Sequence, residues 1–416
     1  MRLGPILPLD LRRHAAARPL ALAIRDGEGD HDYASLDRAA DLAASGLQAW
    51  GIAPGDRVAL LVAPSAGAVA LLVGVARAGA VAVPLGTRLT RREVGIALGE
   101  TTPALVVHDD SLAAAAAGHG VPSLLPADLA ARAAGRGRQG VGLDPAAPVV
   151  AVLTSGTTGR PKAALLSHAA LAASAAAWSA ALPPATGWLL CLGLAHVAGL
   201  GVAWRALGAG VPLHVVSGFD APAVLAALRA SDAPSHVSLV PVQLARLLGA
   251  APSAAEPGTA PPPALRAVLL GGAPIPPALV RRAAGAGWPV IPTYGLTEAG
   301  SGVTALPADE AAEHPGSAGR PLPGVAVRVA EPGPDGVGAI EVATPAAFTG
   351  YLGHDQATAA ATPPPFSRAR PAFTLAGPNG YLIEAARQEL LARGFSEDQL
   401  LAGGLRVVTT FDRSRQ

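Results

Sequence analysis

The chain has almost no lysine and almost no cysteine. Of its 31 cationic residues, Lys162 is the only lysine and the other 30 are arginine. The single cysteine, Cys191, has no partner for a disulfide or a thiolate metal site, so we expect it in the core. The 31 basic and 30 acidic side chains nearly cancel, which excludes the strong field typical of proteins that bind nucleic acid or anionic membranes. These shortages favour a protein that acts on small molecules.

One uncharged run, residues 58–76, is long enough to cross a bilayer. Pro64, Ser65 and Gly67 divide this run, so we interpret it as a buried strand followed by a helix and expect no transmembrane segment. The first 20 residues contain no uninterrupted apolar core followed by a small-residue cleavage site. We therefore expect no signal peptide and a cytoplasmic protein.

The length of 416 residues predicts two or three lobes. Short apolar runs alternate with alanine-rich helical stretches from residue 57 to about 110, and again from residue 167 onward. This alternation predicts two doubly wound α/β subdomains. From residue 325 the pattern changes to short strands separated by a turn rich in Gly, Pro and Asp, which predicts a small β subdomain.

The strongest motif follows the apolar strand at residues 149–154, where the sequence reads SGTTGRPK. Its two glycines let the backbone approach a ligand closely, and its hydroxyls and consecutive N–H groups can surround phosphate oxygens. It is not a Walker A loop, because Pro161 stands where that motif needs glycine. The residues expected to hold phosphate are Thr154, Ser155, Gly156, Thr157, Thr158, Gly159 and Lys162.

This loop resembles the phosphate loop of the adenylate-forming (AMP-binding) superfamily, of the acyl-CoA synthetase type. Two later segments, LGGAP at 270–274 and YGLTE at 294–298, resemble further motifs of that family in the same order. The resemblance implies that Thr297 contacts phosphate, that Glu298 holds magnesium and that His196 lies beside the acyl substrate. The nucleotide-binding residues that it implies are Gly271, Gly272, Ala273, Pro274, Tyr294 and Gly295.

The resemblance implies ATP-dependent activation of a small carboxylic acid to an acyl-adenylate, the first half-reaction of an acid-CoA ligase, with ATP, Mg²⁺ and CoA as co-substrate. The segments HVSLVPVQLARLL, YGLTEAGSGVTALP and HPGSAGRPLPGVAVRV resemble the o-succinylbenzoate-CoA ligases of menaquinone synthesis. A generic acyl- or aryl-CoA ligase is the alternative, as is a catalytically dead remnant that binds ATP or an acyl-adenylate. Nothing in the sequence indicates an oligomeric state.

The resemblance ends abruptly. Residues 1–360 fit the adenylation core, but no (S/T)GD motif follows and no lysine occurs after Lys162, so we expect the mobile C-terminal domain to be missing. Residues 361–378 read as a linker. Residues 379–416 read as a helix and a strand that resemble a linker of bifunctional penicillin-binding proteins, without the SxxK motif of their transpeptidases. A natural fusion and a wrongly joined sequence both fit this junction, and in either case we expect formation of the CoA thioester to be impaired.

Overall fold

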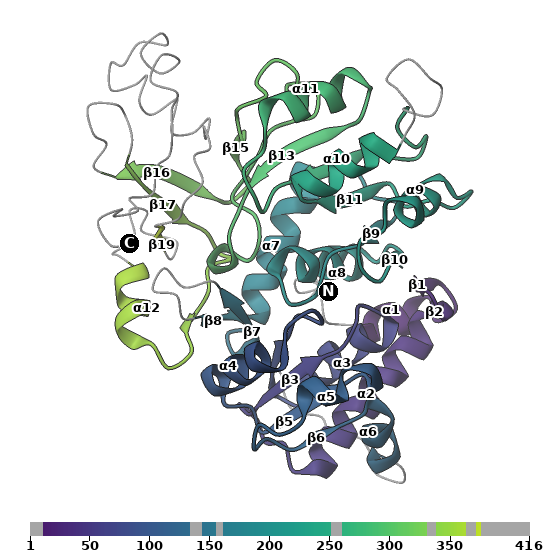
Figure 1. Ribbon diagram of the computed structural model, residues 1–416, viewed down its shortest axis with the longest axis vertical. Coiled ribbons are helices and arrows are strands. Elements are labelled where there is room, and N and C mark those ends of the chain that lie inside the picture. The colour runs from purple at the N-terminus through teal and green to yellow at the C-terminus, as the bar shows by residue number, and fades with distance from the viewer. Residues whose placement is uncertain are drawn as a thin grey trace.

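The computed structural model describes residues 11–133, 144–154, 161–250, 260–330, 338–362 and 372–375. These residues form three β-sheets with helices packed against them (Figure 1). A first lobe, purple and blue, lies below a second lobe, teal and green, and a small sheet with helix α12 lies beside them. The predicted mixed α/β architecture is confirmed.

The first lobe is built on a seven-stranded sheet in the order β18-β8-β7-β4-β3-β5-β6. Strands β3 to β7 run parallel, whereas β8 is antiparallel to both β7 and β18. The strands are β3 (Arg57–Leu61), β4 (Val81–Pro84), β5 (Leu105–His108), β6 (Ser123–Leu124), β7 (Pro148–Thr154), β8 (Lys162–Ser167) and β18 (Gly350–Tyr351). The helices of this lobe are α1 (Leu11–Ala17), α2 (Tyr33–Trp50), α3 (Ala66–Arg77), α4 (Arg91–Thr101), α5 (Ala113–Ala116) and α6 (Pro126–Ala133), with the 3-10 turn η1 (Asp110–Leu112).

The second lobe contains a nine-stranded sheet in the order β15-β14-β13-β12-β11-β9-β10-β1-β2. Its strands are β1 (Leu22–Asp26), β2 (Gly29–Asp32), β9 (Trp188–Leu190), β10 (Leu213–Val215), β11 (His236–Leu239), β12 (Ala267–Leu270), β13 (Val290–Tyr294), β14 (Thr304–Ala305) and β15 (Arg320–Pro321). Its helices are α7 (His168–Ala181), α8 (Val197–Ala209), α9 (Ala221–Arg229), α10 (Pro241–Ala250) and α11 (Pro277–Gly285), with the 3-10 turn η2 (Thr297–Ala299). The β1–β2 hairpin thus comes from the start of the described chain and completes the edge of the distant sheet.

Alternating strand residues divide the apolar side chains between separate cores. On β3, Val58 and Leu60 face the central core, which contains residues of α2, α3, α7 and α8, while Ala59 and Leu61 face the core beneath α4. Strand β12 alternates in the same way between the central core and the outer core beneath α9, α10 and α11. Both sheets are therefore buried on both faces, and the two lobes share one central layer of helices.

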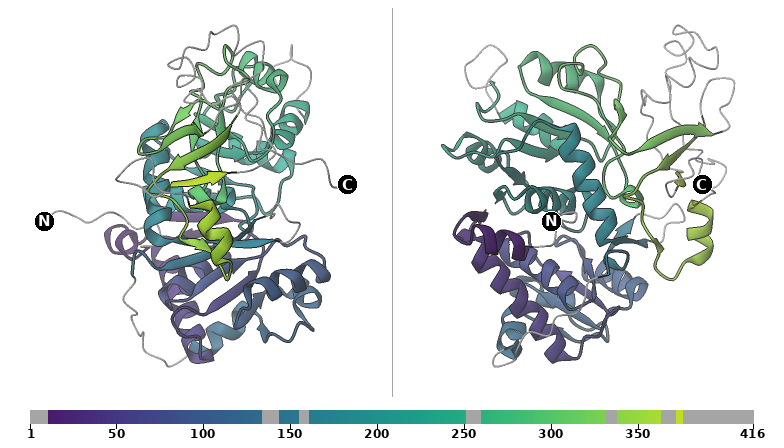
Figure 2. Two further views of the ribbon diagram at one scale, coloured as in Figure 1. Left: turned by 90° about the vertical axis from the view of Figure 1, so that its left-hand side faces the viewer. Right: turned by 180° about the vertical axis from the view of Figure 1, so that it is seen from behind.

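The small sheet has the order β16-β17-β19, and its strands are antiparallel. Its strands are β16 (Ala326–Ala330), β17 (Ala339–Ala343) and β19 (Ala372–Leu375), and α12 (Asp355–Ala361) lies next to it. Figure 2 shows this unit against the junction of the two lobes. The predicted linker, 361–378, is described only at Ala361, at Thr362 and in β19, and the predicted tail, 379–416, lies outside the described residues.

The apolar run 58–76 forms β3, a short connection and most of α3, as the sequence predicted. Ser65 caps α3, since its hydroxyl accepts a hydrogen bond of 3.1 Å from the amide of Ala68. Within the described parts of the chain, no helix is both long and apolar enough to cross a membrane. Cys191 is buried in the core, and burial raises the pKa of its thiol to about 12, which leaves it protonated at neutral pH.

Helices α2 and α3 approach closely because Gly74 of α3 has no side chain. A Cβ atom at this position would lie 2.6 Å from the Cβ of Ala43 and 2.9 Å from the carbonyl oxygen of Ala40, both on α2. Gly67, in the same helix, is exposed, and the nearest atom to its added Cβ would be Ser65 Oγ at 3.7 Å. The two glycines therefore differ in packing, and Gly67 also lies in the first turn of the helix.

Gly74→Ala should lower the free energy of unfolding by about 1 to 3 kcal/mol, because overpacking forces the two helices apart. Gly67→Ala, the matched control, should leave it unchanged or raise it by up to about 1 kcal/mol, since alanine favours the helix. Urea unfolding followed by circular dichroism measures both. Equal stabilities for the two variants would show that the α2–α3 contact is not tight.

Candidate functional site

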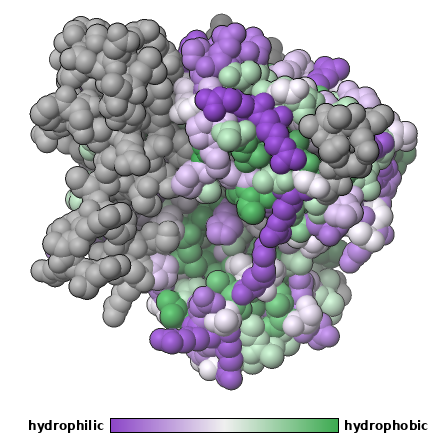
Figure 3. Space-filling model, turned by 45° about the horizontal axis from the view of Figure 1, so that its top comes forward, coloured by the Kyte–Doolittle hydropathy of each residue, from purple (hydrophilic) through white to green (hydrophobic). Residues whose placement is uncertain are grey.

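The predicted site residues follow the carboxyl ends of strands in two sheets. Gly271 follows β12, Tyr294 ends β13 and Thr154 ends β7. In parallel α/β sheets this edge is where ligands bind, because loops rather than helices cover it. Figure 3 shows the surface hollowed between the two lobes, with hydrophobic side chains in the recess and hydrophilic ones around it.

Both anchors of the predicted phosphate loop are described, although Ser155, Gly156, Thr157, Thr158 and Gly159 lie outside the described residues. Thr154 and Lys162 are directly paired across the antiparallel strands β7 and β8. The Thr154 hydroxyl donates a hydrogen bond of 3.1 Å to the carbonyl oxygen of Lys162. The residues at the two ends of the predicted loop are therefore cross-strand neighbours, and Lys162 is the residue at which β8 begins.

The LGGAP segment turns immediately after β12. A side chain at Gly271 would collide with the hydroxyl of Thr293, which donates a hydrogen bond of 3.1 Å to the carbonyl oxygen of Leu270. Gly272 has a φ of +74°, a left-handed conformation that favours glycine. Ala273 is half-buried and Pro274 is exposed. This turn therefore leaves an exposed backbone edge at the end of the sheet.

The YGLTE segment forms the next turn, between β13 and η2. A side chain at Gly295 would collide with the carbonyl oxygen of Ser301, so only glycine fits there. Ser301 itself has a φ of +102°, which is rare for a residue other than glycine and marks local strain. Tyr294, Thr297 and Glu298 are all half-buried at this turn. Strand β8 contacts η2, so Lys162 and Glu298 come from neighbouring elements.

Tyr351, for which no role was predicted, connects these two predicted residues. Its hydroxyl donates a hydrogen bond of 2.6 Å to Glu298 Oε1. The Lys162 ammonium lies 5.5 Å from the centre of its ring, within the range of a cation–π contact. Burial, and then the charge of Glu298 and the hydrogen bond to it, raise the pKa of the Tyr351 phenol. The phenol is therefore a hydrogen-bond donor at neutral pH.

His196 is at the start of α8, where it is the N-cap residue, and its ring is exposed and does not cap the helix. The structure records no contact between His196 and Lys162, Thr297 or Glu298. Its predicted place beside the acyl substrate stays a prediction.

A second cation, Arg205 on α8, is buried behind the YGLTE turn with only 3% of its surface exposed. Its guanidinium lies 4.6 Å from the Trp188 ring and 5.4 Å from the Trp178 ring, and it donates a hydrogen bond of 3.3 Å to Ser238 Oγ. Its Nε and Nη1 atoms have no hydrogen-bond partner in the described chain. Burial lowers the pKa of Arg205 to about 9, so the group is still cationic at neutral pH.

One nitrogen of Arg205 lies near the turn that follows YGLTE, while the guanidinium stacks on Trp188, the first residue of β9. A Cβ atom at Gly201, one helical turn before Arg205, would lie 3.0 Å from Arg205 Nη1 and 3.3 Å from Ser301 Oγ. Ser238 is the penultimate residue of β11, at the same edge of the sheet as the two glycine turns. The only sequence signal for this site was an arginine inside the apolar run GLGVAWRALGAG.

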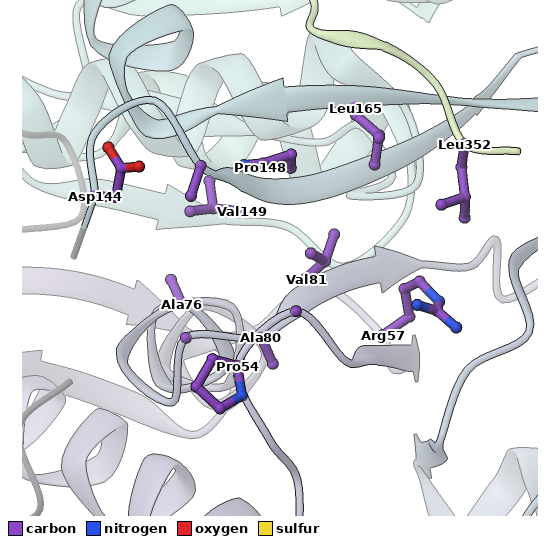
Figure 4. A pocket seen from close by; sticks show the side chains of 13 residues that line it. Pro54, Arg57, Ala76, Ala80, Val81, Asp144, Pro148, Val149, Leu165 and Leu352 are labelled. Atoms are coloured by element: carbon purple, nitrogen blue, oxygen red, sulfur yellow. The ribbon is translucent and has the colours of Figure 1, made fainter. Parts of the chain in front are cut away.

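A cleft of about 480 Å³ lies elsewhere, at the amino ends of β3, β4 and β7 (Figure 4). Arg57, Val81 and Pro148, the first residues of these strands, line it together with mostly apolar side chains. None of the predicted site residues lines this cleft. It is therefore distinct from the candidate site.

Comparison with known proteins identifies the family of the chain. Residues 11–352 match the AMP-binding enzyme family. A feruloyl-CoA synthase from Amycolatopsis sp is 33% identical over 370 residues, which cover 83% of this chain and 72% of that protein. A 2-succinylbenzoate–CoA ligase from Geobacillus kaustophilus (strain HTA426) is 29% identical over 414 residues, which cover 96% of this chain and 80% of that protein.

The solved structure of o-succinylbenzoate CoA synthetase from Bacillus subtilis in complex with its acyl-adenylate intermediate, OSB-AMP, has a TM-score of 0.78 and 25% identity. The structural match covers 88% of this chain and 74% of the chain of that enzyme. The structure of the same enzyme in complex with ATP and a magnesium ion has a TM-score of 0.77 and 25% identity. The match covers 88% of this chain and 75% of that chain. The chain belongs to the AMP-binding enzymes, the adenylate-forming family of acyl- and aryl-CoA ligases.

Proposed function

We propose that this chain activates o-succinylbenzoate, a dicarboxylic acid, as the first half-reaction of an acid-CoA ligase in menaquinone synthesis. One carboxylate oxygen of the acid attacks the α-phosphorus of ATP. A bond forms between that oxygen and phosphorus, the bond to the bridging oxygen of the β-phosphate breaks, and pyrophosphate leaves with the electron pair. The product is an acyl-adenylate.

The observation that carries the choice of acid is the unpaired charge of Arg205. A buried guanidinium that has no anionic partner and leaves two of its three nitrogens without a hydrogen bond is costly, because the charge has lost its water and gained no anion. Ferulate and fatty acids have one carboxylate, which the reaction consumes. A dicarboxylic acid has a second one, which can accept hydrogen bonds from Nε and Nη1 of Arg205 and from the hydroxyl of Ser238.

The other residues serve the nucleotide in this proposal. Lys162 and the backbone amides of its loop stabilise the charge that develops on the phosphates as pyrophosphate leaves. The backbone turns at Gly271 and Gly295 let adenine approach the sheet edge, with Tyr294 beside it. His196 borders the acid at the start of α8.

The residues present suit magnesium. The described chain contains no cluster of three acidic, histidine or cysteine ligands that could hold a metal ion alone. Mg²⁺ is commonly bound by one or two carboxylates together with substrate phosphates, and Glu298 is a half-buried carboxylate on η2, which contacts the strand that begins at Lys162. Bound there, the ion would neutralise phosphate charge. Glu298 would hold it through its carboxylate, whose Oε1 also accepts the hydrogen bond from Tyr351.

The uniqueness of Lys162 allows a direct test of the phosphate site. Acetic anhydride can modify only two kinds of amine in this chain, the Lys162 side chain and the amino terminus. Mg·ATP at ten times its Kd should slow acetylation of Lys162 by about tenfold, since only the free protein reacts. Peptide mass spectrometry measures the rate at each amine, and the amino terminus is the internal control. AMP should protect less, because it lacks the β- and γ-phosphates. Equal rates with and without ATP would remove Lys162 from the nucleotide site.

Exchange of pyrophosphate into ATP tests the reaction and the acid together. The chain should catalyse exchange with o-succinylbenzoate, and weakly or not at all with ferulate, palmitate or 4-oxo-4-phenylbutanoate, which lacks the ring carboxylate. Binding of ATP without exchange for any acid would indicate a catalytically dead remnant. Faster exchange with ferulate or palmitate would indicate a generic ligase instead.

Arg205→Met should lower kcat/KM for o-succinylbenzoate by roughly 30-fold or more, because truncating one partner of a buried charge pair costs about 2 to 5 kcal/mol. The same variant should raise the midpoint of thermal unfolding of the free protein, since an unpaired buried charge is replaced by an apolar side chain. Arg12→Met, at an exposed arginine on α1, is the control and should change neither quantity. An unchanged kcat/KM for Arg205→Met would contradict the assignment of the second carboxylate.

A further inference from the structure

We propose that Tyr351 is a positioning residue that fixes the carboxylate of Glu298 and the ammonium of Lys162 relative to each other for the magnesium–nucleotide complex. The inference rests on the proposed function, and it assigns a role to a residue outside the predicted site.

The segment 348–351 contacts Glu298 twice. The Tyr351 hydroxyl donates to Glu298 Oε1 at 2.6 Å, and the amide of Phe348 donates to the carbonyl oxygen of Glu298 at 2.8 Å. Side chain and backbone of Glu298 are thus both held by the same four-residue segment. A hydrogen bond to Oε1 orients the carboxylate that would hold the metal.

Strand register brings the same tyrosine to Lys162. Tyr351 pairs with Ala164 in the antiparallel β18–β8 ladder, and Lys162 lies two residues before Ala164 on β8. Residues two apart on a strand share a face, so Lys162 is the diagonal neighbour of Tyr351. The 5.5 Å separation of the ammonium from the ring centre follows from this register. It keeps the only lysine of the chain over the ring whose hydroxyl donates to Glu298.

Tyr351 is itself held from two further sides. The Phe348 ring contacts it edge-on, with the ring centres 4.9 Å apart and the planes at 66°. The backbone amide of Tyr351 donates a hydrogen bond of 2.9 Å to the hydroxyl of Thr358 on α12. That hydroxyl in turn donates a hydrogen bond of 3.0 Å to the carbonyl oxygen of His354. The phenol is therefore supported by the start of α12 as well as by β8, which suits a group whose task is to position others.

Two substitutions separate the two contacts. Tyr351→Phe removes the hydroxyl and keeps the ring, so it should disturb Glu298 and spare Lys162. Tyr351→Leu removes both. Tyr33→Phe is the matched control, because the Tyr33 hydroxyl is buried without a hydrogen-bond partner in the described residues and Tyr33 belongs to α2.

The metal contact is measured by titrating Mn²⁺ into the protein complexed with AMPCPP, a nucleotide that cannot release pyrophosphate, and recording the free ion by electron paramagnetic resonance. Tyr351→Phe should raise the Kd for Mn²⁺ by about 10- to 100-fold, the usual effect of losing a group that orients a metal ligand. Its affinity for AMPCPP in EDTA should not change. Tyr33→Phe should match the unsubstituted protein in both measurements.

The lysine contact is measured by the acetylation rate of Lys162 in the free protein. Tyr351→Leu should change this rate, while Tyr351→Phe should not, because only the first loses the ring. An unchanged Kd for Mn²⁺ in Tyr351→Phe, or identical acetylation rates in all variants, would overturn the role of Tyr351. Absence of pyrophosphate exchange in the unsubstituted protein would instead overturn the proposed reaction, and the Mn²⁺ titration would still test Tyr351 independently.

Discussion

Strand β8 is hydrogen-bonded on both sides, by β7 and by β18, and this double antiparallel pairing determines how Thr154, Lys162 and Tyr351 lie relative to one another. Pairing with β7 places Thr154 opposite Lys162, the two ends of the predicted phosphate loop. Pairing with β18 places Tyr351 diagonal to Lys162. From there the phenol reaches Glu298 in the second lobe, so one strand relates groups that come from three distant parts of the sequence.

The distribution of cations agrees with a site that binds phosphate at one place and a carboxylate at another. Lys162, compact and half-buried, lies where a phosphate loop closes, and a flexible ammonium suits a charge that moves during the reaction. Arg205, rigid and buried between two tryptophan rings, suits the fixed recognition of a carboxylate by its planar fork. A monocarboxylic acid would leave the second of these cations without a counter-charge.

Much of the fold was predictable from sequence, and much of the site was not. The division of residues 58–76 into β3 and α3 could be predicted because Pro64 and Ser65 interrupt the apolar run. Motif resemblance identified Lys162 and Glu298 as candidates, and their predicted roles remain to be tested. Tyr351 was not predicted as a site residue, because its partner Glu298 lies 53 residues away and their hydrogen bond depends on strand register. Arg205 was not predicted as a site residue, because the sequence does not show which of its nitrogen atoms lack a hydrogen-bond partner.

The transfer of oxygen during the reaction tests the central claim most directly. The chain is incubated with ATP, Mg²⁺, hydroxylamine and o-succinylbenzoate labelled with ¹⁸O in its carboxylates. Hydroxylamine attacks the acyl carbon of the acyl-adenylate and forms the hydroxamate, so AMP leaves with the bridging oxygen that came from the carboxylate. The nucleotide products are then analysed by mass spectrometry. Attack of the carboxylate on the α-phosphorus predicts AMP that carries one ¹⁸O atom, together with unlabelled pyrophosphate. ADP with labelled phosphate, or AMP without label, would contradict the account.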